Sequence, residues 1–600
     1  MILRSLNDLY YRLLEQGEIA PAGWTIERVH YAVEIDSSGE LLDIIPLTDE
    51  RGRRQKKYRM MQIPARGTRT STKILPHLLC DTSPYFFGIP NKKDISKDKI
   101  EYEKSRARKC FVASRELHKK LLAGIDDPSA QAVIRFYEKW DPEKAKQHPV
   151  LRDKYDEIRT KGSLIWMPNG RYITDNEAIT AAVDALTSQD SSEGENVVVG
   201  QCLVTGERDH IARIHPLIKG VFGAQSSGAS LVGFNIDSAC SYGRSQSYNA
   251  PVGKRTAVAY SQALNHLLKD NDHKLVMGDT TVVFWAESPS NSYPDLVTMS
   301  FNPNPDVISM DNRTLKESVE MLSQGKIIDF HEEQIDPSTP FFMLGLSPNA
   351  GRLSVRFFFN SSFGSLMKNI DEHWKRLEIV RPINDERELL SMWSLLCETV
   401  NRNRKAENPK PSPQLTGDFL RAVIENHRYP DTLLLAVHRR ILAEQGYVTR
   451  GRAALIKAFL LKNTENRVIK EVVNSVKLNE ETRYVPYILG RLFSVLESVQ
   501  ESANPGVNTT IRNRYFSAAC STPAMVFPVL IRLTQSHLRK LDKKLATYYQ
   551  KQITELLGHM EVSFPTHLVL QDQGIFALGY YHQRQERFAK KEEKTNDRTN

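Results

Sequence analysis

Cysteine is scarce in this sequence, and its spacing excludes the usual cysteine-based sites. The six cysteines are scattered over 600 residues, at Cys80, Cys110, Cys202, Cys240, Cys397 and Cys520. None belongs to a CxxC pair, so we expect reduced thiols and no structural zinc, which needs four nitrogen or sulfur ligands. Residues 202–207 resemble one half of a zinc knuckle whose second cysteine is missing.

Long apolar runs are absent as well. No stretch of about 18 apolar residues occurs, so a transmembrane helix is not expected. The N-terminal residues lack the apolar core and the small-residue cleavage site of a secretory signal. Hydrophobic residues make up 40% and charged residues 26% of the chain, which is typical of a globular protein. We therefore expect a soluble cytoplasmic protein.

The sequence also lacks the short motifs of common nucleic-acid enzymes. It has no His-Asp dipeptide for a metal nuclease, no GxxxxGK[ST] phosphate loop and no GxSxG nucleophile elbow. The nearest approach to a catalytic cluster is the pair His210 and His215 beside Asp209, and ordinary loop histidines explain it more simply. We predict no catalytic residue, cofactor or metal. The alternative is a stand-alone metal-dependent nuclease or RNA-processing enzyme.

Positive charge is concentrated near the N-terminus, although the net charge of the whole chain is only +9. Residues 1–50 carry three basic and ten acidic side chains, whereas residues 51–73 carry nine basic side chains and no acidic one. The nine are Arg51, Arg53, Arg54, Lys56, Lys57, Arg59, Arg66, Arg69 and Lys73. A solvated basic loop is one interpretation. Polar side chains such as Gln62 and Thr68 lie among the charges, and this mixture favours contacts with a nucleic-acid backbone.

A second unusual stretch, residues 220–255, is rich in glycine, serine and side-chain amides. Small residues let backbone N–H groups approach a phosphate closely, and amides can both donate to and accept from base edges. Tyr242 and Tyr248 could stack on bases. The polar candidates are Gln225, Ser226, Ser227, Gly228, Asn235, Gln246 and Asn249, with Lys254 and Arg255 as phosphate contacts. A tight structural turn at residues 225–228 is the alternative.

Hydrophobic periodicity predicts an α+β chain with several domains. In the first part, we expect helices at residues 3–16, 92–123 and 128–140 and a β-hairpin over residues 30–47. In the middle, strands at residues 274–285 and 352–359 precede a helix at 363–379. Strand signals then fade, and helices are expected at residues 385–401, 416–426, 431–444, 450–462, 464–476, 481–500, 508–520, 522–557 and 566–588.

These patterns predict four structured parts and a tail. They are a basic, mixed α/β N-terminal lobe at residues 1–186, a β-rich middle lobe at 197–380, a helical connector at 381–476, an all-α C-terminal helical bundle at 477–590 and a disordered tail at 591–600. The polar, acidic residues 187–196 are the expected linker between the first two lobes. The tail is rich in charge and poor in apolar residues, which is typical of disorder.

The second stretch also carries a family resemblance. Its pieces are residues 205–207 (TGE), 214–216 (IHP), 220–235 (GVFGAQSSGASLVGFN), 241–243 (SYG) and 246–252 (QSYNAPV). Together they look like the signature of the large-subunit family of subtype I-C CRISPR surveillance complexes. Further segments similar to the family lie before and after this stretch, at residues 60–69, 78–88, 276–285, 345–356 and 452–457. The resemblance therefore extends over nearly the whole chain.

This resemblance implies a non-catalytic DNA-binding subunit of an RNA-guided complex in antiviral defence. The guide CRISPR RNA reads sequence by base pairing, while the protein inspects the protospacer-adjacent motif (PAM) beside the target and promotes R-loop formation. The basic residues 51–73 would contact duplex phosphates, and the 225–228 loop with the nearby amides would inspect the groove and separate strands. The implied partners are guide RNA, target double-stranded DNA and its displaced strand, backbone subunits, the handle-processing subunit and a helicase–nuclease recruited in trans. No membrane partner is implied.

The C-terminal helices resemble the family's small subunit, which is also made separately from an internal start. Between Met392 and Met525 there is no methionine, so such a product would need a non-AUG start, for example near Val472 or Val476. Six basic residues are candidates for binding a single strand or a heteroduplex: Arg512, Arg514, Arg532, Arg539, Lys543 and Lys544. A bundle with an ordinary solvated surface is the alternative.

Overall fold

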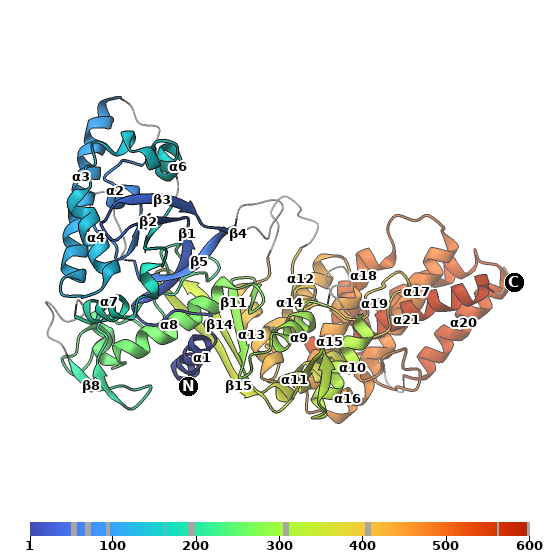
Figure 1. The fold of residues 1–600 in the computed structure, drawn as a ribbon. Coiled ribbons are helices and arrows are strands. Elements are labelled where there is room, and N and C mark those ends of the chain that lie inside the picture. Colours follow the sequence, from blue (N-terminus) through green and yellow to red (C-terminus); the bar gives the residue numbers. More distant parts are fainter. Residues whose placement is uncertain are drawn as a thin grey trace. The chain divides into compact units, whose positions relative to one another are not determined.

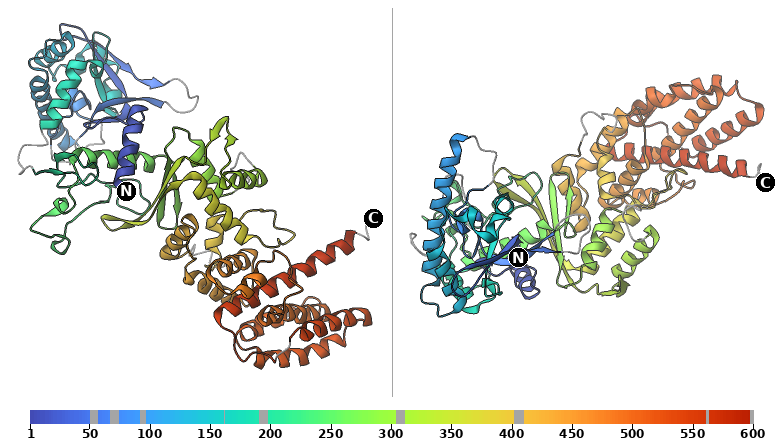
Figure 2. Two further views of the ribbon diagram at one scale, coloured as in Figure 1. Left: turned by 90° about the horizontal axis from the view of Figure 1, so that it is seen from below. Right: turned by 45° about the horizontal axis from the view of Figure 1, so that its top comes forward.

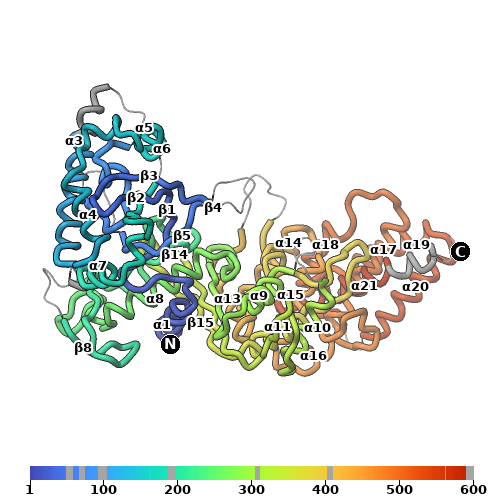
Figure 3. The backbone as a smooth tube through the Cα atoms, viewed as in Figure 1, coloured from blue at the N-terminus to red at the C-terminus, as the bar shows by residue number. Residues whose placement is uncertain are grey.

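The structure is a computed structural model that describes most of the chain. The described residues are 1–49, 57–66, 74–91, 97–160, 162–189, 198–303, 311–401, 410–560 and 563–596. They form two compact units, whose helices and strands are labelled in Figure 1 and whose backbone can be followed in Figure 3. The first unit joins Met1–Pro216 to Val232–His266, and the second joins Leu217–Leu231 to Leu267–Asn600.

The first unit is built around a mixed four-stranded sheet. Its strand order is β3 (Leu41–Pro46), β2 (Tyr31–Ile35), β7 (Leu164–Pro168) and β6 (Cys80–Asp81). Strands β2 and β3 pair antiparallel, so the predicted hairpin is confirmed, and β7 adds parallel to β2. The hairpin turns at Gly39, where φ is +83° and a Cβ would lie 2.5 Å from the backbone nitrogen of Phe136.

A second sheet in this unit contains the middle part of the basic segment, residues 57–64. Its order is β1 (Trp24–Val29), β5 (Lys57–Pro64) and β4 (Thr48–Asp49). Strand β5 pairs antiparallel with β1 from Trp24 opposite Pro64 to Val29 opposite Arg59. A solvated loop was one interpretation of this segment, but its described part is a strand, from which Ile63 and the partly buried Met61 pack on the core.

Helices cover these sheets and enclose an aromatic core. Trp166 of β7 is fully buried and stacks on Phe86 with ring centroids 4.3 Å apart, and Phe136 contacts it edge-on. The helices are α1 (Ile2–Glu15), α2 (Ser83–Phe86), α3 (Lys97–Leu122), α4 (Pro128–Lys139), α5 (Pro149–Arg152), α6 (Tyr155–Thr160), α7 (Glu177–Gln189) and α8 (Lys254–Lys269). The predicted helices at 3–16, 92–123 and 128–140 are therefore confirmed as α1, α3 and α4.

The second unit begins with an antiparallel four-stranded sheet. Its order is β10 (Lys274–Met277), β11 (Thr280–Ala286), β14 (Pro340–Asn349) and β15 (Arg352–Ser362). The predicted single strand at 274–285 is thus two strands, because the chain turns at Gly278 with φ of +64°. A small hairpin, β12 (Ile328–Phe330) and β13 (Glu333–Ile335), comes between β11 and β14 in the sequence. Helix α11 (Phe363–Leu377), which Ser362 caps, confirms the helix expected at 363–379.

Two of the remaining helices of the second unit, α9 (Ser292–Phe301) and α10 (Asn312–Ser323), were not predicted, and the others follow the predicted order with two differences. The others are α12 (Met392–Cys397), α13 (Pro413–Ile424), α14 (Asp431–Ala443), α15 (Arg450–Asn463), α16 (Arg467–Val473), α17 (Val485–Ala503), α18 (Ile511–Ser521), α19 (Pro523–Leu538), α20 (Lys543–Gly558) and α21 (Leu570–Asn596). Helix α12 is shorter than expected, and the single helix expected at 522–557 is α19 followed by α20. Asp542 accepts a hydrogen bond from the backbone N–H of Leu545 and so starts α20 as a new helix.

One buried core runs through the second unit. It extends without interruption from Met277 of the sheet to Tyr581 of α21. Figure 2 shows the strands giving way to helices along the chain, and the segment from α12 to α21 is entirely helical among its described residues. The predicted α+β class with a helical C-terminal part is therefore confirmed. The boundaries proposed at 186, 380 and 476 stay predictions. No described helix combines the length and the apolar character needed to cross a bilayer.

Candidate nucleic-acid interface

A cleft in the first unit gathers four basic side chains from two distant segments. We call it the basic cleft; its volume is about 820 Å³, and its basic residues are Arg208, Arg213, Lys254 and Arg255. Among the described residues that line it, Asp209 is the one acidic residue, so the lining carries a net positive charge. A hollow with this charge attracts anions, and low-dielectric walls strengthen the attraction.

Backbone pairing brings the two segments together. Strand β9 (Arg208–His210) pairs with β8 (Val199–Gln201), Ile211 forms a bridge with Gly253, and the N–H of Ala212 donates to the carbonyl oxygen of Val252 at 2.9 Å. A Cβ at Gly253 would lie 2.5 Å from Oδ2 of Asp209, so this close approach needs glycine. Helix α8 begins at the next residue, and the partial positive charge of its N-terminus adds to that of the cleft.

Asp209 and His215, which a nuclease mechanism would need, both have partners inside the protein. Oδ1 of Asp209 accepts a hydrogen bond from the backbone N–H of His210, and its Oδ2 lies 3.5 Å from Nε of Arg255. His215 is only 3% exposed, and its Nδ1 lies 2.6 Å from the hydroxyl of Tyr260. Burial lowers the pKa of His215 to about 4, so this imidazole is neutral at physiological pH. Within the described ranges, no three His, Cys, Asp or Glu side chains form a metal-binding cluster.

Two of the four amides predicted to read bases, Gln246 and Asn249, have partners inside the protein. Oδ1 of Asn249 accepts from the N–H of Ser241, and its Nδ2 donates to the carbonyl oxygens of Arg244 and Gln246. Oε1 of Gln246 accepts from Nε of Arg213 at 2.8 Å. Asn249 therefore closes the 241–249 loop, and Gln246 holds one of the basic side chains of the cleft.

The glycine- and serine-rich loop at residues 225–228 belongs to the second unit. Gly228 has φ of +104°, donates its N–H to the carbonyl oxygen of Gln225 at 2.9 Å, and is buried. Ile218 and Ala229 exchange two backbone hydrogen bonds that close the loop, and Ser230 extends this contact to the β14–β15 turn. The side chains of Gln225, Ser226 and Ser227 are exposed. The loop is thus a tight turn that presents three polar side chains. Asn235, also exposed, belongs to the first unit.

The predicted basic segment is only partly described. Arg51, Arg53, Arg54, Lys56, Arg69 and Lys73 lie outside the described residues, as does the side chain of Lys57. Arg59 is exposed on β5, with its guanidinium 5.4 Å from the centre of the Tyr172 ring. Nη1 of Arg66 lies 3.1 Å from Oε2 of Glu27, and its Nη2 donates to Sγ of Cys80. Arg66 therefore has an internal partner for its charge.

The C-terminal basic residues differ in exposure. Arg514, Arg532, Arg539, Lys543 and Lys544 are exposed on α18, α19, the α19–α20 turn and α20. Arg512 instead lies 3.9 Å from the buried carboxylate of Glu497, with its guanidinium 5.7 Å from the centre of the Tyr447 ring. The side chain of Arg512 therefore has partners inside the bundle, and the strand-binding role of the other five stays a prediction.

Comparison with known proteins identifies the chain. The family profile described as CRISPR-associated protein (Cas_Csd1) matches residues 6–588. The chain belongs to the Cas_Csd1 family. This is the large-subunit family of type I-C CRISPR complexes, so the resemblance seen in the sequence is confirmed. No curated protein matches the chain significantly.

Sequence reasoning missed two residues of the basic cleft in this Cas_Csd1 chain, Arg208 and Arg213. They lie some forty positions before Lys254 and Arg255, and no local pattern joins the two groups. Only the pairing of the 208–212 backbone with the segment before α8 brings them together. The sequence signal that could have drawn attention to these two arginines is that they flank Asp209 and His210.

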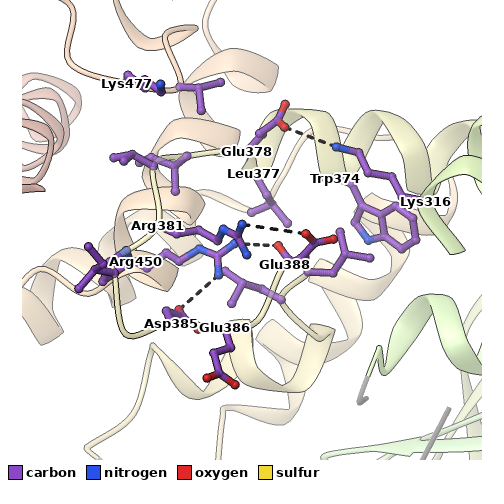
Figure 4. A pocket seen from close by; sticks show the side chains of 17 residues that line it. Lys316, Trp374, Leu377, Glu378, Arg381, Asp385, Glu386, Glu388, Arg450 and Lys477 are labelled. Atoms are coloured by element: carbon purple, nitrogen blue, oxygen red, sulfur yellow. Dashed lines mark hydrogen bonds and ion pairs between the residues drawn. The ribbon is translucent and has the colours of Figure 1, made fainter. Parts of the chain in front are cut away.

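A second hollow, in the second unit, is less suited to an anion. It has a volume of about 660 Å³, and Figure 4 shows that most of its charged side chains form ion pairs with each other. Lys316 lies 3.4 Å from Glu378, and Arg450 lies 3.3 Å from Asp385 and donates to the carbonyl oxygen of Glu388 at 2.8 Å. Because basic and acidic side chains balance there, the basic cleft is the stronger candidate for nucleic acid.

Proposed function

We propose that this Cas_Csd1 chain is the non-catalytic, DNA-binding large subunit of an RNA-guided type I-C interference complex. It recognises the PAM beside the target, promotes R-loop formation and helps to recruit a separate helicase–nuclease. The family match over residues 6–588, which includes both units, carries this proposal. Its partners are then guide CRISPR RNA, target DNA and its displaced strand, the handle-processing and backbone subunits, and a small subunit.

The basic cleft supports a phosphate-binding role for the first unit. Arg208, Arg213, Lys254 and Arg255 line one hollow, and each phosphate that they neutralise would release counterions. Affinity should therefore fall with salt, with a slope of log K against log[salt] of about −0.7 to −0.9 for each phosphate contacted. Such contacts position the nucleic acid and do not by themselves read its sequence.

The test uses the full complex assembled with guide RNA and its partner subunits. Binding of target duplexes with and without the flanking motif is measured over a range of salt concentrations. We expect motif-dependent binding by the wild type. For the double variant Arg208→Glu and Arg255→Glu, we expect weaker binding to every duplex and a shallower salt slope.

A matched control for charge reversal lies far from the cleft in sequence. Arg467 of α16 is 91% exposed, and its side chain forms an ion pair with Glu471 on the same helix. Arg467→Glu should therefore bind DNA like the wild type. Equal binding by the wild type and the cleft variant would refute the role of the cleft. Target opening that proceeds without this polypeptide would refute the function as a whole.

The enzymatic alternative is tested on the purified chain. A nuclease would need an acid or an imidazole free to act on substrate, whereas Asp209 faces Arg255 and His215 is buried against Tyr260. We expect no cleavage of DNA or RNA with Mg²⁺ or Mn²⁺. Metal-dependent cleavage that is lost in Asp209→Asn would contradict the proposal.

A further inference from the structure

An aromatic side chain stands at the tip of a strained turn in the first unit. The N–H of Arg244 donates to the carbonyl oxygen of Ser241 at 3.0 Å, which closes a four-residue turn. Its two central residues, Tyr242 and Gly243, have φ of +54° and +67°, as in a type I′ turn. Asparagine and glycine normally occupy such turns, and a bulky residue in the left-handed region is unusual. The conformation of Tyr242 therefore costs free energy that something else must offset.

The base of the turn is held by a single side chain. The amide of Asn249 accepts from the N–H of Ser241 and donates to the carbonyl oxygen of Arg244, so it binds both ends of the turn. Its second contact, to the carbonyl oxygen of Gln246, fixes the following segment. The turn is thus preorganised, with Tyr242 locked at its tip.

The same loop is fastened to the basic cleft. The N–H of Ser247 donates to the carbonyl oxygen of Arg213 at 3.2 Å, while the Gln246 amide holds the guanidinium of Arg213. Arg213 lines the cleft. The turn that carries Tyr242 and a phosphate-binding candidate therefore form one connected structure.

Tyr242 packs against nothing in the described part of its own chain. It is 99% exposed, the highest value among the exposed large hydrophobic residues. Residues 241–255 contain Arg244, Lys254 and Arg255 and no acidic residue, so the surroundings favour an anionic partner. An exposed aromatic ring beside basic side chains matches what unpaired nucleotides need, since the ring stacks on a base and the cations bind the phosphates.

We propose that Tyr242 is a stacking finger that binds an unpaired base of single-stranded nucleic acid, with Asn249 as the positioning residue that holds it out. The proposal deepens the function given above and rests on it, because an R-loop is where this protein would meet unpaired bases. A duplex offers no free base face except at its ends, so the finger does not act on intact duplex.

The decisive experiment uses the purified full-length chain and single-stranded 12-mers that carry 2-aminopurine, whose fluorescence falls when it stacks on an aromatic ring. We expect quenching by the wild type and by Tyr242→Phe, which keeps the ring. Tyr242→Ala should lose the quenching and bind about 5- to 150-fold more weakly, the usual range for removing one stacked base contact. Asn249→Ala should reduce quenching while Tyr242 is still present. Tyr11→Ala, which removes another exposed tyrosine of the same unit, should behave as the wild type.

The outcomes separate this proposal from the proposed function. If Tyr242→Ala binds the 12-mers and quenches 2-aminopurine like the wild type, the stacking role of Tyr242 is refuted. It is also refuted if the wild type does not quench at all. Both conclusions hold whatever the complex does with target DNA. Parallel DNA and RNA 12-mers show which strand chemistry it prefers. In the assembled complex, 2-aminopurine placed in turn in the displaced strand, the target strand and the guide identifies the bound strand. Loss of motif-dependent binding by the wild-type complex would instead refute the function and leave the oligonucleotide result standing.

Discussion

Gly490 of α17 and Gly579 of α21 each lie against the backbone of the opposite helix. A Cβ at Gly490 would lie 2.0 Å from the carbonyl oxygen of Phe576, and a Cβ at Gly579 would lie 2.2 Å from that of Tyr487. The two helices therefore meet along their main chains. This contact fixes the pairing on which the C-terminal part of the second unit is built.

Substituting either glycine should destabilise the second unit. In Gly490→Ala the added methyl group must push α21 away, which should lower the free energy of unfolding by about 1–3 kcal/mol. Urea denaturation followed by circular dichroism measures the change. Gly558, at the end of α20, has no atom within 4 Å of its would-be Cβ, so Gly558→Ala should be neutral or slightly stabilising. Equal effects of the two substitutions would contradict the close approach.

Two buried histidines should make the second unit sensitive to acid. Burial, helped by nearby Arg376 and Lys457 respectively, lowers the pKa of His373 and of His582 to about 3. The unfolded chain, with a histidine pKa of about 6.5, binds the proton more tightly, so stability is lost as pH falls below that value. For each histidine, acidification from pH 7 to pH 5 should lower the free energy of unfolding by about 2 kcal/mol.

The measurement compares urea unfolding at pH 7 and pH 5. His582→Gln should lose less stability on acidification than the wild type, even if it is less stable at pH 7. The exposed His567 is the control, and His567→Gln should show the wild-type pH dependence. A wild-type stability that does not change over this range would show that the two imidazoles are accessible to protons in the folded state.

Arg452 of α15 joins three helical segments through buried charges. It is 2% exposed, its Nη1 lies 2.7 Å from Oε2 of Glu444, and its Nε lies 3.4 Å from Oε2 of Glu398. Arg452→Met would leave both carboxylates without this partner, which should cost about 3–5 kcal/mol. The exposed pair of Arg467 and Glu471 is the contrast, and Arg467→Ala should cost at most about 0.5 kcal/mol.

The cost of Arg452→Met should shrink in acid. Burial raises the pKa of Glu444, but hydrogen bonds from Arg452 and Arg440 more than offset this and lower it overall. A depressed carboxylate pKa stabilises the fold above the unfolded value of about 4.3, and this contribution is lost as pH falls through the folded pKa. Unfolding free energies of the wild type and the variant should therefore converge below about pH 4. A difference that stays constant with pH would refute the ionic origin.

The local fold could be predicted from the sequence where one segment carries its own signal. The apolar spacing of α1 and α4 and the alternation of β15 are such signals, because burial of one face repeats with the period of the element. The sequence does not show the break between α19 and α20, because apolar residues continue through Leu538 and Leu541 and hide the helix cap at Asp542.

The candidate site was only partly predictable for a different reason. Lys254 and Arg255 were found because they follow a glycine-rich run, whereas Arg213 joins them only through pairing between distant segments. The amide of Asn249 was suited by type to base reading, yet its partners lie in its own loop. Residue type shows what a side chain can bond, and only the fold shows which bonds are already made.

Arg66 provides a test of the predicted basic segment. Its guanidinium faces Glu27 and Sγ of Cys80, whose thiol pKa burial raises to about 12. Arg66→Glu should therefore destabilise the first unit by about 1–3 kcal/mol, because it leaves like charges and a partly buried group without a partner. The double variant Arg66→Glu and Glu27→Arg should recover much of this loss in a double-mutant cycle of urea unfolding. Arg59→Glu, on the exposed part of β5, should affect DNA binding more than stability.

Gln246 distinguishes a positioning role from base reading. Because its Oε1 accepts from Nε of Arg213, Gln246→Ala should remove this hold on the guanidinium and weaken target binding about 5- to 10-fold, the equivalent of ~1–1.4 kcal/mol for one typical hydrogen bond. Binding by the assembled complex is measured with several flanking motifs, in the wild type and in the Arg213→Ala background. If Gln246 acts through Arg213, its substitution should weaken all motifs alike and have no further effect once Arg213 is gone. A change in preference among motifs that persists in the Arg213→Ala background would show that the amide reads bases directly.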